Sequence, residues 1–194
     1  MLTLYYSPGS SAMATHIALH EIGAPFELIL VPLHEQANRA PDYLAVNPEG
    51  KVPTLVIDGC KLTEVAATLW YLARRFPAAG LLPQLGDIEA EAQVISWMSF
   101  IAATIHPARR AGEERWREVF ALADRRLGAA DWAVDRYSIA DIHLFRLYWR
   151  FETALHPASA DHPNLDRHYR RMLARPAVQR TLEAEAKVGY NLPG

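Results

Sequence analysis

Residues 47–55 are the stretch whose residue types could most directly hold a ligand. Asn47-Pro48-Glu49-Gly50 has the composition of a tight turn, because proline fixes φ and glycine permits a positive φ. Val52 precedes a proline and is therefore expected to be extended. Pro53 lacks an N–H, so it should lie at the first residue or the edge of a strand over 54–57. That placement leaves the N–H and C=O of Val52 for a peptide-like ligand. About 5–6% of X-Pro bonds are cis, so by itself the stretch is interpreted as an ordinary loop-to-strand junction.

Two neighbouring hydroxyls, Ser10 and Ser11, stand between an expected strand over 2–6 and an expected helix over 12–22. Serine just before a helix commonly caps its first N–H groups. Neither serine resembles a hydrolase nucleophile, because the pattern Gly-x-Ser-x-Gly is missing. The residues alone therefore predict helix caps.

Metal and redox chemistry receive little support from the sequence. His16 and His20 are four residues apart, but Ile17 takes the place of the glutamate in His-Glu-x-x-His and no third ligand is evident. We predict no metal cofactor. Cys60 is the single cysteine, which excludes an internal disulfide and a Cys-x-x-Cys pair. It follows the hairpin signal Asp58-Gly59 and is interpreted as a structural, unreactive thiol.

The composition is that of a globular protein with one sizeable domain or two small ones. The 194 residues are 51% hydrophobic and 22% charged, and the formal net charge is −2. This charge argues against nucleic acid or an anionic membrane as the main partner. Residues 1–6 alternate like a strand and lack the layout of a signal peptide, so we expect a cytoplasmic protein.

The first part of the chain reads as βαβ followed by ββα. The strand over 2–6, the helix over 12–22 and a strand over 26–31 form a βαβ unit, whose two strands should be parallel. Strands over 54–57 and 61–62 flank the Asp58-Gly59 turn, and a helix follows from residue 63 or 64 to 76. We predict an α/β domain over 1–77.

After a linker rich in proline, glycine and alanine at 78–86, every signal is helical, and 87–194 is predicted to be an all-α domain. Ser138-Ile139-Ala140-Asp141 is a capping box variant. The helix that it begins is apolar nearly all round and should be buried. The other expected helices are a long one over 87–105, one around 114–127, and two that begin at Pro163 and Pro176.

One face of the long helix carries small or polar residues at i, i+4 and i+7: Ser99, Ala103 and His106. Small side chains there would leave room for a ligand, although a tight helix contact is the commoner cause. His106 precedes Pro107, which disfavours helix at His106. The imidazole is therefore expected at the C-terminal, negative end of this helix.

Taken together, four motifs resemble those of glutathione transferases, and the resemblance covers essentially the whole chain. It implies a thioredoxin-like N-terminal domain and an all-helical C-terminal domain. The bacterial beta class is the most similar, also through Ser99-Phe100-Ile101-Ala102 and the His106 that follows. The motifs are Tyr5-Tyr6-Ser7-Pro8-Gly9, Asn47-Pro48-x-Gly50-x-Val52-Pro53, Leu62-Thr63-Glu64 and Tyr137-Ser138-Ile139-Ala140-Asp141.

The resemblance assigns contacts to glutathione, the expected co-substrate. It implies that Val52-Pro53 is cis and that the Val52 backbone pairs with the cysteinyl part, and it adds His34 to the contacts. Chemistry supports two further residues: Glu64 suits the γ-glutamyl ammonium, while the helix N-terminus at Val65 suits the carboxylate. Without the resemblance, an acid that only favours its own helix dipole is an equal interpretation of Glu64.

At the position of the beta-class cysteine this chain has Ser11, with Ser10 beside it. No mixed disulfide can form there, so thiol-transferase chemistry should be absent. Lowering a thiol pKa of about 8.5 by two units takes about 2.7 kcal/mol. A hydroxyl hydrogen bond supplies roughly 1.5–3 kcal/mol and a helix N-terminus about 0.3–1, so one serine suffices. Ser11 is the first candidate and Ser10 the second; Tyr5 and Tyr6 also compete, because a strand-end tyrosine activates the thiol in other classes.

Two further positions depart from the family pattern. Val65 stands where many relatives carry serine or glycine, so one hydrogen bond of about 0.5–1.5 kcal/mol to glutathione is lost and weaker binding is expected. His106 faces the thiol in the beta class, but Pro107 replaces the basic residue that usually follows it. The electrophile pocket is expected near Ser99, Ala103 and His106.

The sequence therefore predicts a homodimeric, cytoplasmic glutathione transferase that adds the glutathione sulfur to a small hydrophobic electrophile. Dimerisation follows from the resemblance alone. Glutathione-dependent isomerases, dehalogenases and lyases have the same fold and are alternative functions. The alternative from another class is a non-catalytic glutathione- or ligand-binding protein that has lost thiol activation together with the cysteine.

Overall fold

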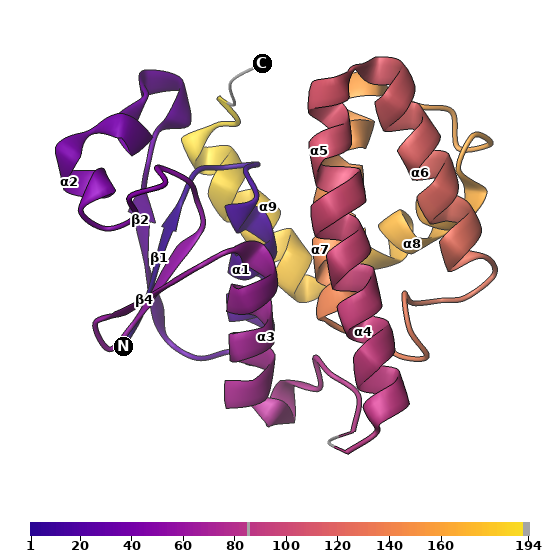
Figure 1. Cartoon of the computed structure of the whole chain (residues 1–194), viewed down its shortest axis with the longest axis horizontal. Helices are drawn as coiled ribbons and strands as arrows, with labels where there is room; N and C mark the ends of the chain where they lie inside the picture. Colours follow the sequence, from indigo (N-terminus) through magenta and orange to yellow (C-terminus); the bar gives the residue numbers. More distant parts are fainter. Residues whose placement is uncertain (85, 192–194) are drawn as a thin grey trace. The chain divides into compact units, whose positions relative to one another are not determined.

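The computed structural model describes residues 1–84 and 86–191, which group into two compact units (Figure 1). One unit contains Met1–Phe76 together with the helix that begins at Pro176, and the other contains Pro77–Arg175. The first is α/β and the second is helical, so the predicted order of an α/β part and an all-α part is confirmed.

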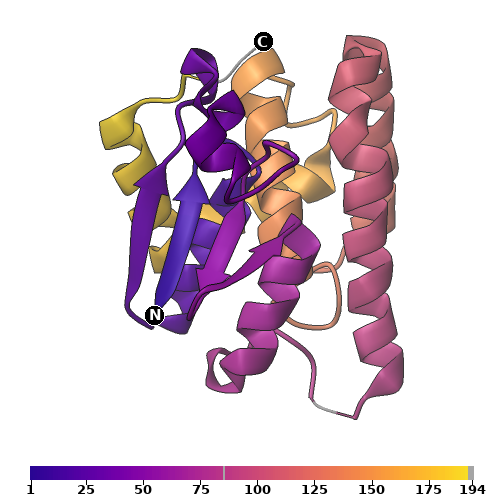
Figure 2. The same ribbon diagram turned by 60° about the vertical axis from the view of Figure 1, so that its left-hand side comes forward.

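A four-stranded sheet organises the first unit, in the order β2-β1-β3-β4 (Figure 2). The strands are β1 (Leu2–Tyr6), β2 (Phe26–Leu30), β3 (Thr54–Ile57) and β4 (Cys60–Thr63). β1 is parallel to β2 and antiparallel to β3, and β3 is antiparallel to β4, as the βαβ and hairpin signals predicted. β3 is an interior strand, and Pro53 precedes its first residue. Pro53 thus lies next to the first of the two places expected for it, the first residue of the strand; the alternative, an edge strand, is wrong because β1 and β4 occupy both sides of β3.

Two helices of the first unit, α1 (Ala12–Ile22) and α3 (Val65–Arg75), pack on each other. Most of α1 is buried, and Gly23 ends it in the left-handed conformation with φ 67°. The hydroxyls of Thr15 in α1 and Thr68 in α3 lie 2.7 Å apart and join the two helices. The connection from β2 to β3 holds the 3-10 turns η1 (Leu33–Glu35) and η2 (Ala37–Arg39) and the short helix α2 (Pro41–Leu44), and η3 (Pro77–Ala79) follows α3 in the second unit.

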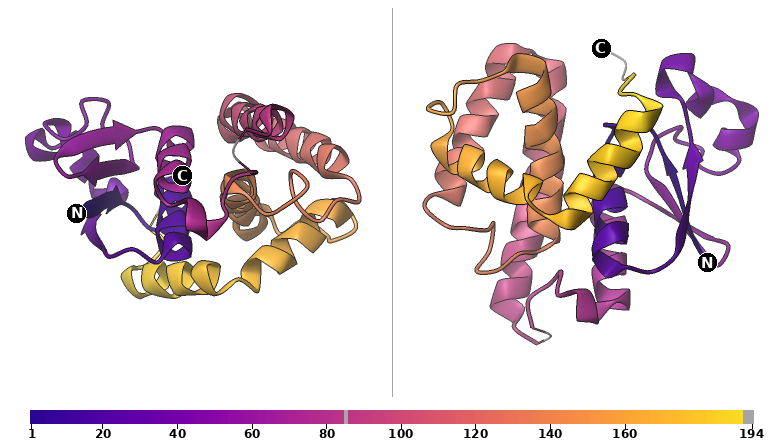
Figure 3. Two further views of the ribbon diagram at one scale, coloured as in Figure 1. Left: turned by 90° about the horizontal axis from the view of Figure 1, so that it is seen from below. Right: turned by 180° about the vertical axis from the view of Figure 1, so that it is seen from behind.

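The last helix, α9 (Pro176–Val188), lies against α1 (Figure 3). By packing it groups with the first unit, although the sequence interpretation counted residues 87–194 as one helical domain. Ala177, Val178 and Thr181 are buried, and Arg180 donates to the carbonyl of His20 at the end of α1. These contacts explain the grouping, and the domain limits at 77 and 87 stay a prediction.

The second unit is built around α7 (Ile139–Leu155), which is buried on nearly every side as predicted. Its capping box is present: Ser138 Oγ accepts from the Ala140 N–H at 3.2 Å, and Asp141 accepts from the Ser138 N–H at 2.9 Å. Pro163 begins a helix as expected. The other helices of this unit are α4 (Ile88–Phe100), α5 (His106–Ala108), α6 (Glu113–Leu127) and α8 (Pro163–Leu173).

The long helix does not end at His106, so that expectation is wrong. His106 is helical, with φ −60° and ψ −46°, and the chain continues through α5 to a 3-10 turn at Arg109–Ala111. A π-helical turn, η4 (Ile101–Ile105), precedes it, and the His106 N–H bonds to the carbonyl of Ile101. Pro107 has no N–H to donate to a carbonyl of the preceding turn. The wider π-helical turn shifts the hydrogen-bond pattern just before Pro107, and the helix therefore continues past the proline.

No helix of the described residues is long and apolar enough to cross a membrane. Cys60 is the first residue of β4, one residue before the strand expected over 61–62, and it is exposed.

Candidate active site

Three segments singled out from the sequence meet at one end of the sheet. The pairing of β1 with β3 places Tyr5 opposite Thr54, and the pairing of β3 with β4 places Thr54 opposite Thr63. β1 therefore ends where β3 begins and where β4 ends (Figure 2). The segments brought together there are the loop 7–11, the Val52-Pro53 pair and Glu64 with Val65.

The side chains of two asparagines, the buried Asn47 and the half-buried Asn38, hold the turn before Val52 in place. Asn47 is 2% exposed; its Nδ2 donates to the Lys51 carbonyl at 2.8 Å and its Oδ1 accepts from the Glu49 N–H at 3.1 Å. Asn38 Nδ2 donates to the Gly50 carbonyl at 2.7 Å. Gly50 has φ 62°, and a Cβ there would lie 2.8 Å from the Asn38 carbonyl oxygen. This turn accordingly requires glycine.

The Val52-Pro53 bond is cis. Val52 is about nine-tenths buried and lies outside the sheet ladder, because β3 begins at Thr54. Within residues 1–84 and 86–191, no hydrogen bond reaches the N–H or C=O of Val52. Backbone groups without a partner are suited to an extended peptide.

Glu64 has φ 66° and ψ 126°, a conformation that non-glycine residues rarely adopt. Such strain is of order 1–3 kcal/mol and clusters at ligand sites. The side chain is exposed and makes no ion pair within the described chain. Val65, which is 8% exposed, begins α3 directly after it, and no side chain caps that helix. A carboxylate and uncapped helical N–H groups therefore lie side by side.

The loop after β1 separates the roles of its two serines. Ser10 is 5% exposed, its N–H donates to the Ser7 carbonyl, and its hydroxyl accepts from the Ala12 N–H at 3.2 Å. Ser10 thus acts as a helix cap, one of the roles that the sequence predicted. Ser11, the last residue before α1, is only half-buried.

The two tyrosines pack in opposite directions, as neighbours in a strand must. Tyr6 packs against His16 of α1, with ring centroids 5.7 Å apart, and is 5% exposed. Burial, with a smaller effect of the Glu185 carboxylate, raises the pKa of Tyr6. Tyr5 is half-buried and packs against Tyr43 at 5.7 Å. Among the four candidate hydroxyls, only Ser11 and Tyr5 keep partial exposure.

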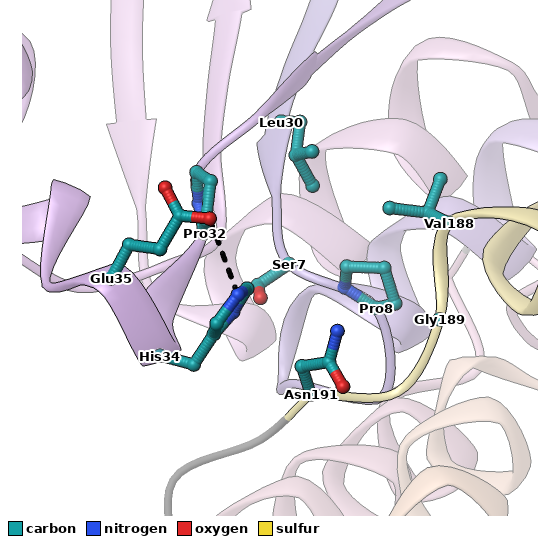
Figure 4. Close-up of a pocket in the computed structure, with 9 residues that line it drawn as sticks. All are labelled: Ser7, Pro8, Leu30, Pro32, His34, Glu35, Val188, Gly189 and Asn191. Carbon is teal, nitrogen blue, oxygen red and sulfur yellow. Dashed lines mark ion pairs between the residues drawn. The ribbon is translucent and has the colours of Figure 1, made fainter.

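A pocket of about 230 Å³ lies beside this loop (Figure 4). His34, which the resemblance added to the glutathione contacts, lines it and forms an ion pair with Glu35 at 3.3 Å. Both side chains are partly exposed to solvent. The pocket is lined by Ser7, Pro8, Leu30, Pro32, His34, Glu35, Val188, Gly189 and Asn191.

The face proposed for the electrophile belongs to the second unit. Ser99, Ala103 and His106 are all exposed there, and the π-helical turn runs through this face. π-helical turns occur frequently at functional sites. A neighbouring histidine, His143, is buried; burial, with smaller contributions from His106 and Arg146, lowers its pKa to about 3.

One buried acid near the loop was missed by the sequence interpretation. Glu185 of α9 is fully buried; its Oε2 accepts from the Gly9 N–H at 2.7 Å, and its Oε1 lies 3.0 Å from Nδ1 of His16. The chain separates Gly9 from Glu185 by 176 residues. No local pattern could have paired them. His16 and His20 stack on each other, and no group of three or more His, Cys, Asp or Glu side chains able to hold a metal occurs in the part of the chain that the structure describes.

A four-stranded βαβ–ββα sheet with a cis proline before its third strand, followed by a helical unit, defines a class of two-part proteins with a thioredoxin-like ligand site. Family models assign the particular family. The glutathione S-transferase N-terminal domain matches residues 1–74, and the glutathione S-transferase C-terminal domain matches residues 95–176. The chain belongs to the glutathione S-transferase family.

Known proteins agree with this assignment. The glutathione S-transferase GstA of Escherichia coli O157:H7 is 34% identical over 201 residues, which cover 95% of this chain and 98% of that protein. A sphingomonad glutathione S-transferase solved in complex with glutathione has a TM-score of 0.84 and 34% identity, covering 95% of this chain and 98% of that one. A beta-class transferase of Sphingomonas chungbukensis has a TM-score of 0.82 and 33% identity, covering 94% and 98%.

Proposed function

We propose that this protein binds glutathione at the end of the sheet, ionises its thiol and transfers the sulfur to a small hydrophobic electrophile. The observation that carries the proposal is the meeting of three complementary groups: the unpaired backbone of Val52, the exposed carboxylate of Glu64 beside the uncapped start of α3, and the serine loop after β1. Each matches a different part of the tripeptide.

Binding of the tripeptide divides among these groups. The N–H and C=O of Val52 pair with the cysteinyl backbone. Glu64 meets the γ-glutamyl ammonium, and the first N–H groups of α3 meet the γ-glutamyl carboxylate. His34, in the wall of the pocket beside the loop, would contact the remaining glycyl end. The exposure of Glu64 and its lack of an ion pair in the described chain support this assignment.

Thiol activation is assigned to Ser11. Its position directly before α1 and its partial exposure support the choice, whereas Ser10 is buried as a cap and Tyr6 is buried against α1. A donated hydrogen bond of roughly 1.5–3 kcal/mol lowers the thiol pKa by one to two units. Ser10, Tyr5 and Tyr6 remain the competing donors; alanine at Ser10 or Ser11 and phenylalanine at Tyr5 or Tyr6 separate the four.

In the transfer step the thiol proton leaves to solvent and the sulfur forms a bond with the electrophilic carbon. For an aromatic chloride, the carbon–chlorine bond breaks and chloride departs with the bonding electrons. We place the electrophile near Ser99, Ala103 and His106, whose exposure supports the choice. The working form is proposed to be a cytoplasmic homodimer.

The experiment combines calorimetry with glutathione, an ultraviolet scan for bound thiolate at neutral pH, and turnover with an aromatic chloride. Binding, thiolate absorbance and a conjugate support the transferase. Binding without thiolate overturns thiol activation and favours a carrier of glutathione. Thiolate without a conjugate points to an isomerase, dehalogenase or lyase on the same fold, and absence of binding removes the site altogether.

A further inference from the structure

The carboxylate of Glu185 joins the last helix to the loop that carries the serines. Glu185 Oε2 accepts from the Gly9 N–H at 2.7 Å, and Oε1 lies 3.0 Å from His16 Nδ1. All three residues belong to the first compact unit. Gly9 stands one residue before Ser10 and two before Ser11, so this bond is made inside the proposed activating segment.

Because Glu185 is buried, its carboxylate depends on the hydrogen bonds that Gly9 and His16 provide. The side chains of Glu185 and His16 are 0% and 1% exposed. A buried carboxylate is costly unless hydrogen bonds compensate for its lost water. One of its two donors is a main-chain N–H of the loop, so any movement of Gly9 leaves the carboxylate under-satisfied. The loop is thus held by an acid that tolerates little displacement.

The end of α9 contacts the same region from a second direction. Val188, Gly189 and Asn191 line the pocket beside Pro8, and His34 and Glu35 lie on its other side (Figure 4). At the far end of α1, Arg180 donates to the His20 carbonyl at 3.2 Å. The last helix therefore bonds α1 at His16 and at His20, and of these two contacts only the one made by Glu185 also reaches the serine loop.

We propose that Glu185 is a positioning residue for thiol activation: by holding the Gly9 N–H it fixes the segment from which the serine hydroxyl reaches the glutathione sulfur. This inference rests on the proposed function. Glu185 itself touches no substrate in the proposed arrangement. Its effect is exerted through the backbone of the loop.

The surrounding charges indicate that the effect is geometric. The ionisable groups that interact with Glu185 are Tyr6 of β1, His16 of α1 and Tyr190 of the C-terminal segment. A carboxylate so near the loop disfavours further negative charge: burial is the main cause of the raised pKa of Tyr6, and the Glu185 carboxylate adds to it. Glu185 therefore cannot favour a thiolate by its own field. It favours the thiolate only by placing a donor.

This distinction sets the choice of variants. Glu185→Gln keeps an oxygen for the Gly9 N–H, and its amide N–H can donate to the other tautomer of His16. Glu185→Met has a similar volume and no strong acceptor. Arg180→Ala is the matched control, because it removes a contact between α9 and α1 away from the loop. The readouts are the pH profile of conjugation, the pKa of bound glutathione, glutathione affinity and thermal unfolding.

We expect Glu185→Met to raise the apparent pKa of bound glutathione by about one unit and to lower kcat near neutral pH about tenfold or more. Glutathione affinity should change less than about threefold, because the contacts at Val52, Glu64 and Val65 are untouched. Glu185→Gln should keep the wild-type pH profile. Arg180→Ala should lower only the unfolding temperature.

Three outcomes overturn the inference. A folded Glu185→Met protein with the wild-type pH profile leaves Glu185 as an anchor of α9 only. A Glu185→Gln profile shifted as far as that of Glu185→Met shows that the charge, not the placement of Gly9, matters. If Glu185→Met does not fold, Glu185→Asp decides: its shorter arm withdraws the acceptor but keeps the charge, and an unchanged profile refutes positioning. Wild-type protein without bound thiolate overturns the proposed function itself.

Discussion

A hydroxyl at residue 11 takes the place of a thiol in the beta-class pattern, and this single difference sets the chemistry expected of the protein. A cysteine there can become covalently linked to glutathione, whereas a serine can only donate a hydrogen bond. Ser11 precedes α1, whose N-terminus adds a smaller favourable field for an anion. We propose that the hydroxyl and the helix together ionise the substrate thiol without a protein thiol.

Replacement of this hydroxyl tests its role directly. Ser11→Ala should raise the apparent pKa of bound glutathione by one to two units, because it removes a contribution of roughly 1.5–3 kcal/mol. The conjugation rate with an aromatic chloride, measured against pH, should shift to higher pH while calorimetry shows little change in glutathione affinity. If Tyr5 or Tyr6 is the donor, Ser11→Ala leaves the profile alone and the corresponding Tyr→Phe moves it.

The opposite substitution restores the beta-class residue. Ser11→Cys should form a mixed disulfide with oxidised glutathione, since the new thiolate attacks one sulfur and releases the other half as free glutathione. Mass spectrometry should show one added glutathione per chain. The exposed Cys60 of the same protein is the internal reference. Labelling at Cys60 alone would mean that residue 11 does not face the ligand.

Glu64 combines an exposed charge with a strained backbone; the charge is expected to affect glutathione binding, and the backbone conformation is expected to affect stability. Glu64→Gln should weaken glutathione binding much more than it lowers the free energy of unfolding, because the lost partner is the ligand's ammonium. Glu64→Gly should also weaken binding, but without loss of stability, since glycine accepts φ 66° freely. Calorimetry and denaturant unfolding measure the two effects.

The matched control for Glu64 is Glu27→Gln. Glu27 is an exposed acid on β2 of the same sheet, away from the end where the three segments meet. We expect it to leave glutathione affinity unchanged. Equal affinity in Glu64→Gln and wild type would remove Glu64 from the site.

The turn over 47–50 is the element that presents Val52, and its rigidity comes from side chains that bond its carbonyls. Gly50→Ala would bring a Cβ within 2.8 Å of the Asn38 carbonyl. We expect it to lower the unfolding temperature and to weaken glutathione binding by displacing the Val52 backbone. Gly59→Ala is the control: its φ of 91° carries a similar conformational cost, but no atom lies within 4 Å of the added Cβ. It should lower stability without affecting binding.

The helix that carries His106 shows how one element can override a local rule. A residue before proline is disfavoured in a helix, yet His106 is helical and Pro107 lies inside α5. The π-helical turn over Ile101–Ile105 adjusts the hydrogen bonding just before the proline. It also changes the angular relation between Ser99 and His106, because each residue of a wider turn advances by a smaller rotation. The electrophile face is therefore set by the π turn as well as by sequence spacing.

Across the whole molecule, a buried histidine in the second unit and a half-buried histidine in the first make stability depend on pH. Burial lowers the pKa of His143 to about 3 in the second unit and that of His20 to about 4 in the first. In the unfolded chain both have pKa values near 6.5. Below about pH 6.5 these histidines are protonated in the unfolded chain but still neutral in the folded chain. Stability is therefore fully present above pH 6.5 and falls as the pH drops towards 4.

Denaturant unfolding between pH 7.5 and 4.5 measures this dependence. The free energy of unfolding should decline with falling pH, with a limiting slope of about 1.4 kcal/mol per pH unit for each such histidine. His143→Gln should flatten the decline. His156→Asn, at an exposed histidine of the same unit, should leave the slope unchanged. An equal slope in wild type and His143→Gln would mean that His143 is protonated in the folded state.

Local patterns in the sequence located the strands and the longer helices, but not the short helix α2, the 3-10 turns between β2 and β3 or the π-helical turn η4. Alternation and turn residues located all four strands, the Asp58-Gly59 hairpin and the parallel start, because these depend on neighbours in the chain. The capping box of α7 and the first-turn proline of α8 were predictable for the same reason. The cis bond at Val52-Pro53 followed only from resemblance to a family, since composition alone favours trans.

Only the tertiary structure decided which distant groups meet. Strand pairing gathers the serine loop, Val52 and Glu64 at one end of the sheet, and no spacing in the sequence encodes that order. Helix packing also groups α9 with the first unit and brings Glu185 to Gly9, 176 residues away in the chain. The physical reason is that local conformational preferences act over only a few residues. The partners that bury apolar area, and the donors that a buried carboxylate needs, come from segments far apart in the chain, and these meet only in the complete fold.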